Sequence, residues 1–82
     1  MKVKPIKPRL VRYLQKNNLS KKFQKQVALL EIDPRYPSLN TERLEPKKLR
    51  LYSFRIDRKY RAIFIMTKGE KIEIIDVNNH YE

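Results

Sequence analysis

Three side chains of types that can act together on a phosphate ester stand far apart in this sequence: Glu45, Arg61 and His80. Glu45 lies in the basic stretch RLEPKK, where a carboxylate either forms an ordinary surface ion pair or stays ionised as a general base. His80 is the only histidine and follows an apolar run, so it is either a solvated tail residue or a proton donor. A base, an acid and a guanidinium without a metal suit transesterification of RNA, in which the 2′-hydroxyl is the nucleophile.

A second feature is a pair of arginines that should repel each other. If a hairpin turn is centred on Arg58, Arg55 and Arg61 face one another on the same side of two antiparallel strands. Like charges directly opposite are destabilising, so the pair needs an anion or a splayed geometry. Either both side chains extend to water at the sheet edge, or the two guanidiniums converge on a phosphate.

Composition narrows the chemistry further. The chain has no cysteine, one histidine and one glycine, which excludes a disulfide framework, a thiolate metal site, a cysteine nucleophile and a glycine-rich phosphate loop. No carboxylate cluster indicates magnesium, so we expect neither metal nor cofactor. The apolar runs are too short to span a membrane, and the N-terminus has no stretch of signal-peptide length, so we expect a cytoplasmic protein.

The charge of the chain indicates which kind of partner it binds. The formal net charge is +11, and the first 50 residues hold 14 Lys and Arg against 4 Asp and Glu. A strongly basic half beside a nearly balanced half indicates a surface for a polyanion, nucleic acid before membrane.

The first half of the chain predicts a short strand over residues 1–6 and then two helices. Pro5 confines that strand to a sheet edge. Apolar residues then recur with helical spacing from Pro8, beside a basic stripe of Arg9, Arg12 and Lys16. Ser20 is the expected N-cap of a second helix, which ends at Asp33-Pro34.

The second half predicts strands. Residues 35–46, RYPSLNTERLEP, have no periodicity and read as a loop. Residues 47–57, 59–67 and 70–78 are rich in aromatic and β-branched residues and are joined by short connections, which indicates an antiparallel meander. The predicted architecture is therefore α+β, with an N-terminal short strand and a helical hairpin packed on an antiparallel β-sheet.

The segments LYSFRIDRKYRAIFIM and KIEIIDVNNHYE resemble the RelE/ParE superfamily of toxins from type II toxin–antitoxin pairs. They share an aromatic-x-aromatic-Arg-Ile segment, a Tyr-Arg pair opening the next strand, and a last apolar strand ending in His-Tyr. The resemblance covers the whole chain, although the specific motifs lie in residues 45–82. It implies a RelE-like, microbial-ribonuclease-like fold and a single toxin domain over residues 1–82.

Within that superfamily the sequence is most similar to the YoeB-like branch, whose members are ribosome-dependent mRNA endonucleases. The resemblance implies Glu45 as the base, His80 as the acid, Arg61 as the phosphate stabiliser and Tyr81 as an orienting or stacking group. Arg55 matches a further basic position near the scissile phosphate.

An alternative catalytic set stays open, because the branch typified by RelE relies more on lysine and arginine. In that case Lys47 and Lys48 would carry the chemistry, and Glu45 would only form a salt bridge. The remaining basic side chains expected to contact RNA are Arg50, Arg9, Arg12 and Lys16.

The leading function is thus a toxin that cleaves mRNA in the ribosomal A site by metal-free acid–base transesterification. Its expected partners are a cognate acidic antitoxin, the ribosome and mRNA. The alternatives are a non-catalytic ParE-like toxin that inhibits DNA gyrase, and a small RNA- or ribosome-binding protein that only uses the basic surface.

Overall fold

The structure is a computed structural model, and it describes residues 1–79 of the 82. In chain order its elements are β1 (Lys2–Val3), α1 (Pro8–Lys16), α2 (Ser20–Ile32), the 3-10 turn η1 (Pro37–Leu39), β2 (Glu42–Arg43), the 3-10 turn η2 (Lys47–Leu49), β3 (Tyr52–Arg55), β4 (Tyr60–Thr67) and β5 (Lys71–Asn79). Among these residues, no helix has the length and apolar character needed to cross a membrane.

The helical hairpin forms as the sequence predicts, with one correction at its turn. Pro8 begins α1, where its fixed φ angle suits a helix and its missing N–H costs nothing. Asn18 then adopts a left-handed conformation, φ 61°, which a short polar side chain tolerates. Ser20 is the first residue of α2 rather than its cap, because Leu19 holds the cap position and no side chain caps the helix. Helix α2 ends at Ile32, directly before Asp33-Pro34, as expected.

The sheet has five strands in the order β1-β5-β4-β3-β2. The α+β prediction is confirmed and β3, β4 and β5 form the expected antiparallel meander, but the sheet is mixed because β1 runs parallel to β5. A long connection, which holds both helices and the strands β2, β3 and β4, separates β1 from β5, and a parallel pair needs such a connection rather than a tight hairpin turn. Pro5 follows this edge strand and offers no N–H with which to extend it.

The segment expected to be an unstructured loop contains the other edge strand. Glu42 and Arg43 of β2 pair with Ser53 and Tyr52 of β3, and the backbone N–H of Leu44 continues the pairing to Leu51. A two-residue strand is too short to show alternation of apolar and polar residues, so the sequence pattern could not reveal it.

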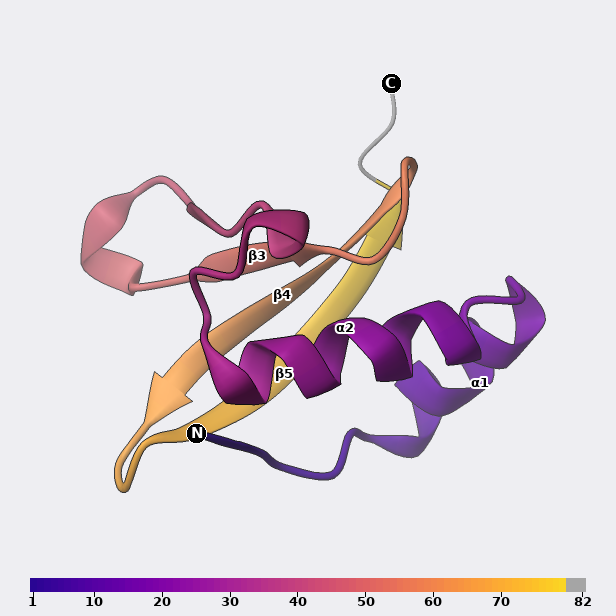
Figure 1. Ribbon diagram of the computed structural model, residues 1–82, viewed down its shortest axis with the longest axis horizontal. Coiled ribbons are helices and arrows are strands. Elements are labelled where there is room, and N and C mark those ends of the chain that lie inside the picture. The colour runs from indigo at the N-terminus through magenta and orange to yellow at the C-terminus, as the bar shows by residue number, and fades with distance from the viewer. Residues whose placement is uncertain (80–82) are drawn as a thin grey trace.

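The hairpin of β3 and β4 has the predicted register, with Arg55 opposite Arg61 and Phe54 opposite Ala62. Phe54 and Ala62 are buried against the helices, so Arg55 and Arg61 belong to the other face of the sheet. Figure 1 shows both helices on one side of β3, β4 and β5, with the β3–β4 turn beside the end of β5.

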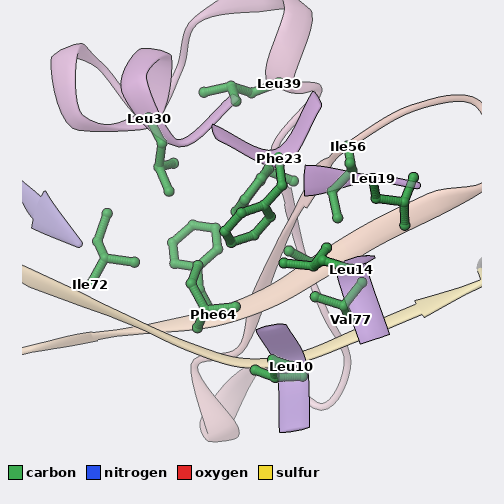
Figure 2. Close-up of a cluster of buried hydrophobic side chains, with 13 residues drawn as sticks. Leu10, Leu14, Leu19, Phe23, Leu30, Leu39, Ile56, Phe64, Ile72 and Val77 are labelled. Atoms are coloured by element: carbon green, nitrogen blue, oxygen red, sulfur yellow. The ribbon is translucent and has the colours of Figure 1, made fainter. Parts of the chain in front are cut away.

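The core lies between the helices and the sheet, as Figure 2 shows. Leu10, Leu14 and Phe23 come from the helices and meet Phe64 and Val77 from the strands. Burying one side chain of this size contributes roughly 1.5–3 kcal/mol, so the core sets the position of the strands. The strands in turn fix where the polar side chains of the opposite face lie.

Candidate functional site

Arg61 is a buried cation at the start of β4, with only 6% of its surface exposed. Its Nε donates a hydrogen bond to Oγ of Ser53 at 3.0 Å. Its Nη2 donates to the carbonyl oxygen of Asn40 at 2.6 Å and to that of Ser53 at 3.3 Å. A carboxylate oxygen of Glu42 lies 3.9 Å from the same nitrogen. We call these four residues the Arg61 cluster.

Burial is the main influence on the pKa of Arg61. It lowers the pKa of the guanidinium, Glu42 opposes that change, and the neighbouring charge of Arg55 adds to it. An arginine nevertheless stays protonated at neutral pH because its ordinary pKa is far higher. The guanidinium of Arg61 therefore keeps its positive charge in a place with little water, beside the carboxylate of Glu42.

Arg55 occupies the same rung of the sheet but is exposed. Its Nε donates to the carbonyl oxygen of Asp57 at 3.3 Å, toward the β3–β4 turn, whereas Arg61 bonds to Ser53 and Asn40. The two side chains thus splay apart to different partners, although the charge of Arg55 still contributes to lowering the pKa of Arg61. The guanidiniums have different partners.

Glu45 lies in the connection between β2 and η2, where the peptide bond to Pro46 is cis. It is exposed, and within residues 1–79 it has no hydrogen bond or ion pair. The carboxylate that the structure brings to Arg61 is that of Glu42, three positions earlier.

Sequence reasoning missed both Glu42 and Ser53. Ser53 could have been found from the sequence, because it lies two residues before Arg55 in the predicted strand and so on the same face of the sheet. The predicted register places that face beside Arg61 on the neighbouring strand. Glu42 gave no such signal, since its position depends on the pairing of the short β2 with β3.

His80 and Tyr81 lie outside the described residues. Strand β5 is described as far as Asn79, which pairs with Tyr60, while Asn78 pairs with Arg61. The last two described residues of β5 therefore pair with Arg61 and with the residue directly before it.

The other basic residues expected to contact RNA fall into two groups. Lys47, Lys48 and Arg50 are exposed in and after η2, and Arg50 is left-handed with φ 55°. On α1, Arg9 is held to β5 by the carbonyl oxygen of Ile75 at 3.1 Å and the carboxylate of Asp76 at 3.7 Å. The remaining two cations, Arg12 and Lys16, are exposed on the same helix.

The described part of the chain contains no group of three or more His, Cys, Asp or Glu side chains placed to hold a metal ion. The Arg61 cluster has one carboxylate, that of Glu42, and it lies beside the guanidinium of Arg61. Chemically, this arrangement offers a guanidinium held in place by hydrogen bonds as a donor to an anion.

Comparisons with known proteins bear on the fold. No protein-family profile and no curated protein matches the sequence. Among solved structures, a YoeB/ParE toxin from Agrobacterium tumefaciens superposes with a TM-score of 0.75, over 99% of this chain and 100% of that one, at 19% identity. The YoeB dimer from Staphylococcus aureus superposes with a TM-score of 0.65, over 98% of this chain and 94% of that one, at 22% identity.

The chain has the fold of YoeB/ParE toxins. The resemblance found in the sequence is confirmed at this level, since both similar structures carry the YoeB name and are matched over nearly their whole length. The YoeB-like fold also accounts for the mixed five-stranded sheet with two helices.

Proposed function

We propose that the chain is the toxin of a toxin–antitoxin pair and acts as a ribosome-dependent mRNA endonuclease. The observation that carries the proposal is the YoeB/ParE fold, matched over 99% of the chain. The net charge of +11 supports a nucleic-acid substrate and an acidic antitoxin as the protein partner. Its site of action is the ribosome, in the cytoplasm.

The proposed reaction is a transesterification within the RNA. The 2′-hydroxyl attacks the adjacent phosphorus while Glu45 accepts its proton, and His80 donates a proton to the departing 5′-oxygen. The products are a 2′,3′-cyclic phosphate and a free 5′-hydroxyl, so no metal or external reactant is needed. Tyr81 orients the reacting group.

The role of Arg61 is to stabilise the charge that develops on the phosphate. Its hydrogen bonds within residues 1–79 use Nε and Nη2. We expect Nη1 to donate to a phosphate oxygen. Because Ser53 and Asn40 already fix the guanidinium, little reorganisation is needed during the reaction. Arg55, on the same rung, adds a second positive charge from the exposed side.

The experiment is primer extension on mRNA in a translating extract, with and without the protein. Wild type should produce discrete cuts that depend on translation. Glu45→Gln and His80→Gln should each reduce cutting by roughly 10²- to 10⁴-fold, the contribution of a positioned acid or base. Glu70→Gln is the matched control, since Glu70 is an exposed carboxylate in the β4–β5 turn.

Two further variants separate the catalytic alternatives. Normal cutting by Glu45→Gln and loss by Glu42→Gln would assign the base to the carboxylate that contacts Arg61. Loss only in the double variant Lys47→Gln/Lys48→Gln would assign the chemistry to lysines of η2. The absence of any cut in an extract that translates normally would refute the nuclease proposal, and inhibition of gyrase supercoiling would then favour the ParE-like alternative.

A further inference from the structure

A basic groove runs beside the β3–β4 turn. Its larger hollow has a volume of about 830 Å³ and is lined by Asn17, Lys22, Arg55, Asp57, Arg58, Lys59 and Tyr60. A second hollow of about 260 Å³ shares Lys22 and Arg55 with the first and adds Lys25, Gln26, Ser38 and Ile56. Because two cations border both hollows, we treat them as one elongated feature, the basic groove.

The groove has an excess of positive charge. Five of its side chains are exposed cations: Lys22, Lys25, Arg55, Arg58 and Lys59. Its one carboxylate, Asp57, forms an ion pair with Lys22 at 3.5 Å. Arg58 and Lys59 have no ion pair within the described residues, so their charges face solvent uncompensated.

The walls of the groove are fixed by hydrogen bonds. Oδ1 of Asp57 accepts from the backbone N–H groups of Lys59 and Tyr60, both at 2.9 Å, which shapes the β3–β4 turn. The hydroxyl of Tyr60 donates to Oδ1 of Asn17 at 3.1 Å and so ties that turn to the end of α1.

The floor of the groove is fixed by a buried side chain. Nε2 of Gln26 donates to the carbonyl oxygens of Arg55 at 2.7 Å and Ser38 at 3.1 Å, joining α2, β3 and η1. The cations are thus carried by a preorganised frame, which lowers the cost of ordering them around a ligand.

We propose that the basic groove binds the phosphate backbone of an RNA strand outside the site of cleavage. A line of cations over two joined hollows suits a polyanion better than a single phosphate. An acidic peptide would need apolar pockets for anchoring side chains, and the groove offers only Ile56 and the ring of Tyr60.

One residue of the groove is paired through the backbone with Arg61. Arg55 lines both hollows and also stands opposite Arg61 on the β3–β4 rung. On this proposal, an RNA strand with one phosphate at Arg61 runs past Arg55 toward Arg58 and Lys59. This inference rests on the proposed function only for the identity of the nucleic acid as RNA.

The test measures binding without cleavage. The probe is a fluorescein-labelled 15-nucleotide 2′-O-methyl RNA, which lacks the hydroxyl nucleophile, and its affinity is followed by fluorescence anisotropy over a range of salt concentrations. The groove variant is Arg58→Gln/Lys59→Gln. The control, Lys68→Gln/Lys71→Gln, removes two exposed charges at the β4–β5 end of the sheet.

We expect the groove variant to bind the RNA roughly tenfold or more weakly at low salt, and its log–log salt slope to be smaller by about 1.4, the value for two lost contacts to a single strand. The control should bind within about twofold of wild type. Circular dichroism should be the same for all three proteins.

Equal effects of the two variants, or no effect of either, would overturn the proposal. The proposal would also be overturned if the groove variant lost more affinity for a 15-residue poly-glutamate peptide than for the RNA. That result would identify a protein as the occupant of the groove. Because the probe cannot be cut, the result is independent of primer extension, and failure of the groove is distinguishable from failure of the nuclease proposal.

Discussion

The Arg61 cluster and the basic groove lie next to each other and both contain positively charged side chains. The charge is buried and paired in the cluster, whereas it is exposed in the groove. In the cluster, Arg61 is 6% exposed, and its guanidinium contacts a hydroxyl, two carbonyl oxygens and a carboxylate. In the groove, Arg58 and Lys59 are exposed and have no ion pair in the described part of the chain.

The difference follows from solvation. A charge removed from water must be compensated by the protein, so the partners of Arg61 are part of the folded structure. A charge in water needs no such compensation and keeps its attraction for a partner in solution. Substitutions in the two regions should consequently separate stability from binding.

The largest effect on stability is expected for Arg61→Met, which keeps the long apolar stem but removes every polar contact. Ser53 and Asn40 would lose their buried donor, and the free energy of unfolding should fall by about 2–3 kcal/mol. Urea denaturation measures this change, with Arg55→Met as the control from the same rung. An equal loss in the control would contradict the distinction between the two arginines.

A smaller loss is expected for Gln26→Leu, which tests the frame under the groove. The carbonyl oxygens of Arg55 and Ser38 would both lose a donor, and we expect a loss of about 1–2 kcal/mol. Gln24→Leu, at an exposed position of the same helix, should be nearly neutral in the same urea titration. A neutral Gln26→Leu would mean that the groove floor does not depend on this side chain.

Asp57→Asn tests the charge at the turn through its pH dependence. Burial opposes ionisation of Asp57, but backbone donors of Tyr60 and Lys59, and then Lys22, outweigh it and lower the pKa of the carboxyl. The resulting stability is fully present above the ordinary aspartate pKa of about 3.9 and is lost as the pH falls through the depressed value.

Wild type should therefore be more stable than Asp57→Asn at pH 7 by about 0.5–1 kcal/mol, and this advantage should disappear in strong acid. Thermal unfolding of both proteins between pH 2 and pH 7 measures it, at roughly 4–8 °C per kcal/mol. A difference that is the same at every pH would show that the carboxylate charge is not responsible.

The smallest effect on stability is expected for Arg58→Gln/Lys59→Gln, the variant that should lose RNA. Both side chains are exposed, so the free energy of unfolding should stay within about 0.5 kcal/mol of wild type. Urea denaturation of the sample used for anisotropy measures it. A loss of stability comparable to that of Arg61→Met would show that these two cations support the fold, and it would contradict the contrast between the two regions.

The sequence by itself determined the features that depend on near neighbours. Helical spacing from Pro8 predicted the helical hairpin, and the aromatic and β-branched residues of 47–57, 59–67 and 70–78 predicted the meander. The first of these runs was predicted too long, because Lys47–Leu49 form η2 and the strand itself is Tyr52–Arg55. A short turn predicted the register that sets Arg55 opposite Arg61. The motifs in residues 45–82 indicated the toxin fold.

Only the tertiary structure decided what surrounds each charge. The parallel pairing of β1 with β5, the placement of Glu42 against Arg61 and the joining of Asn17, Lys22 and the β3–β4 turn into one groove all combine distant segments. Periodicity reports which face of its own element a residue occupies, but not which loop or helix from elsewhere covers that face. For this reason Arg55 and Arg61 differ in solvation although they are the same residue type and face each other in the sheet. The loop at Asn40 contacts the guanidinium of Arg61, while Arg55 lines the open groove.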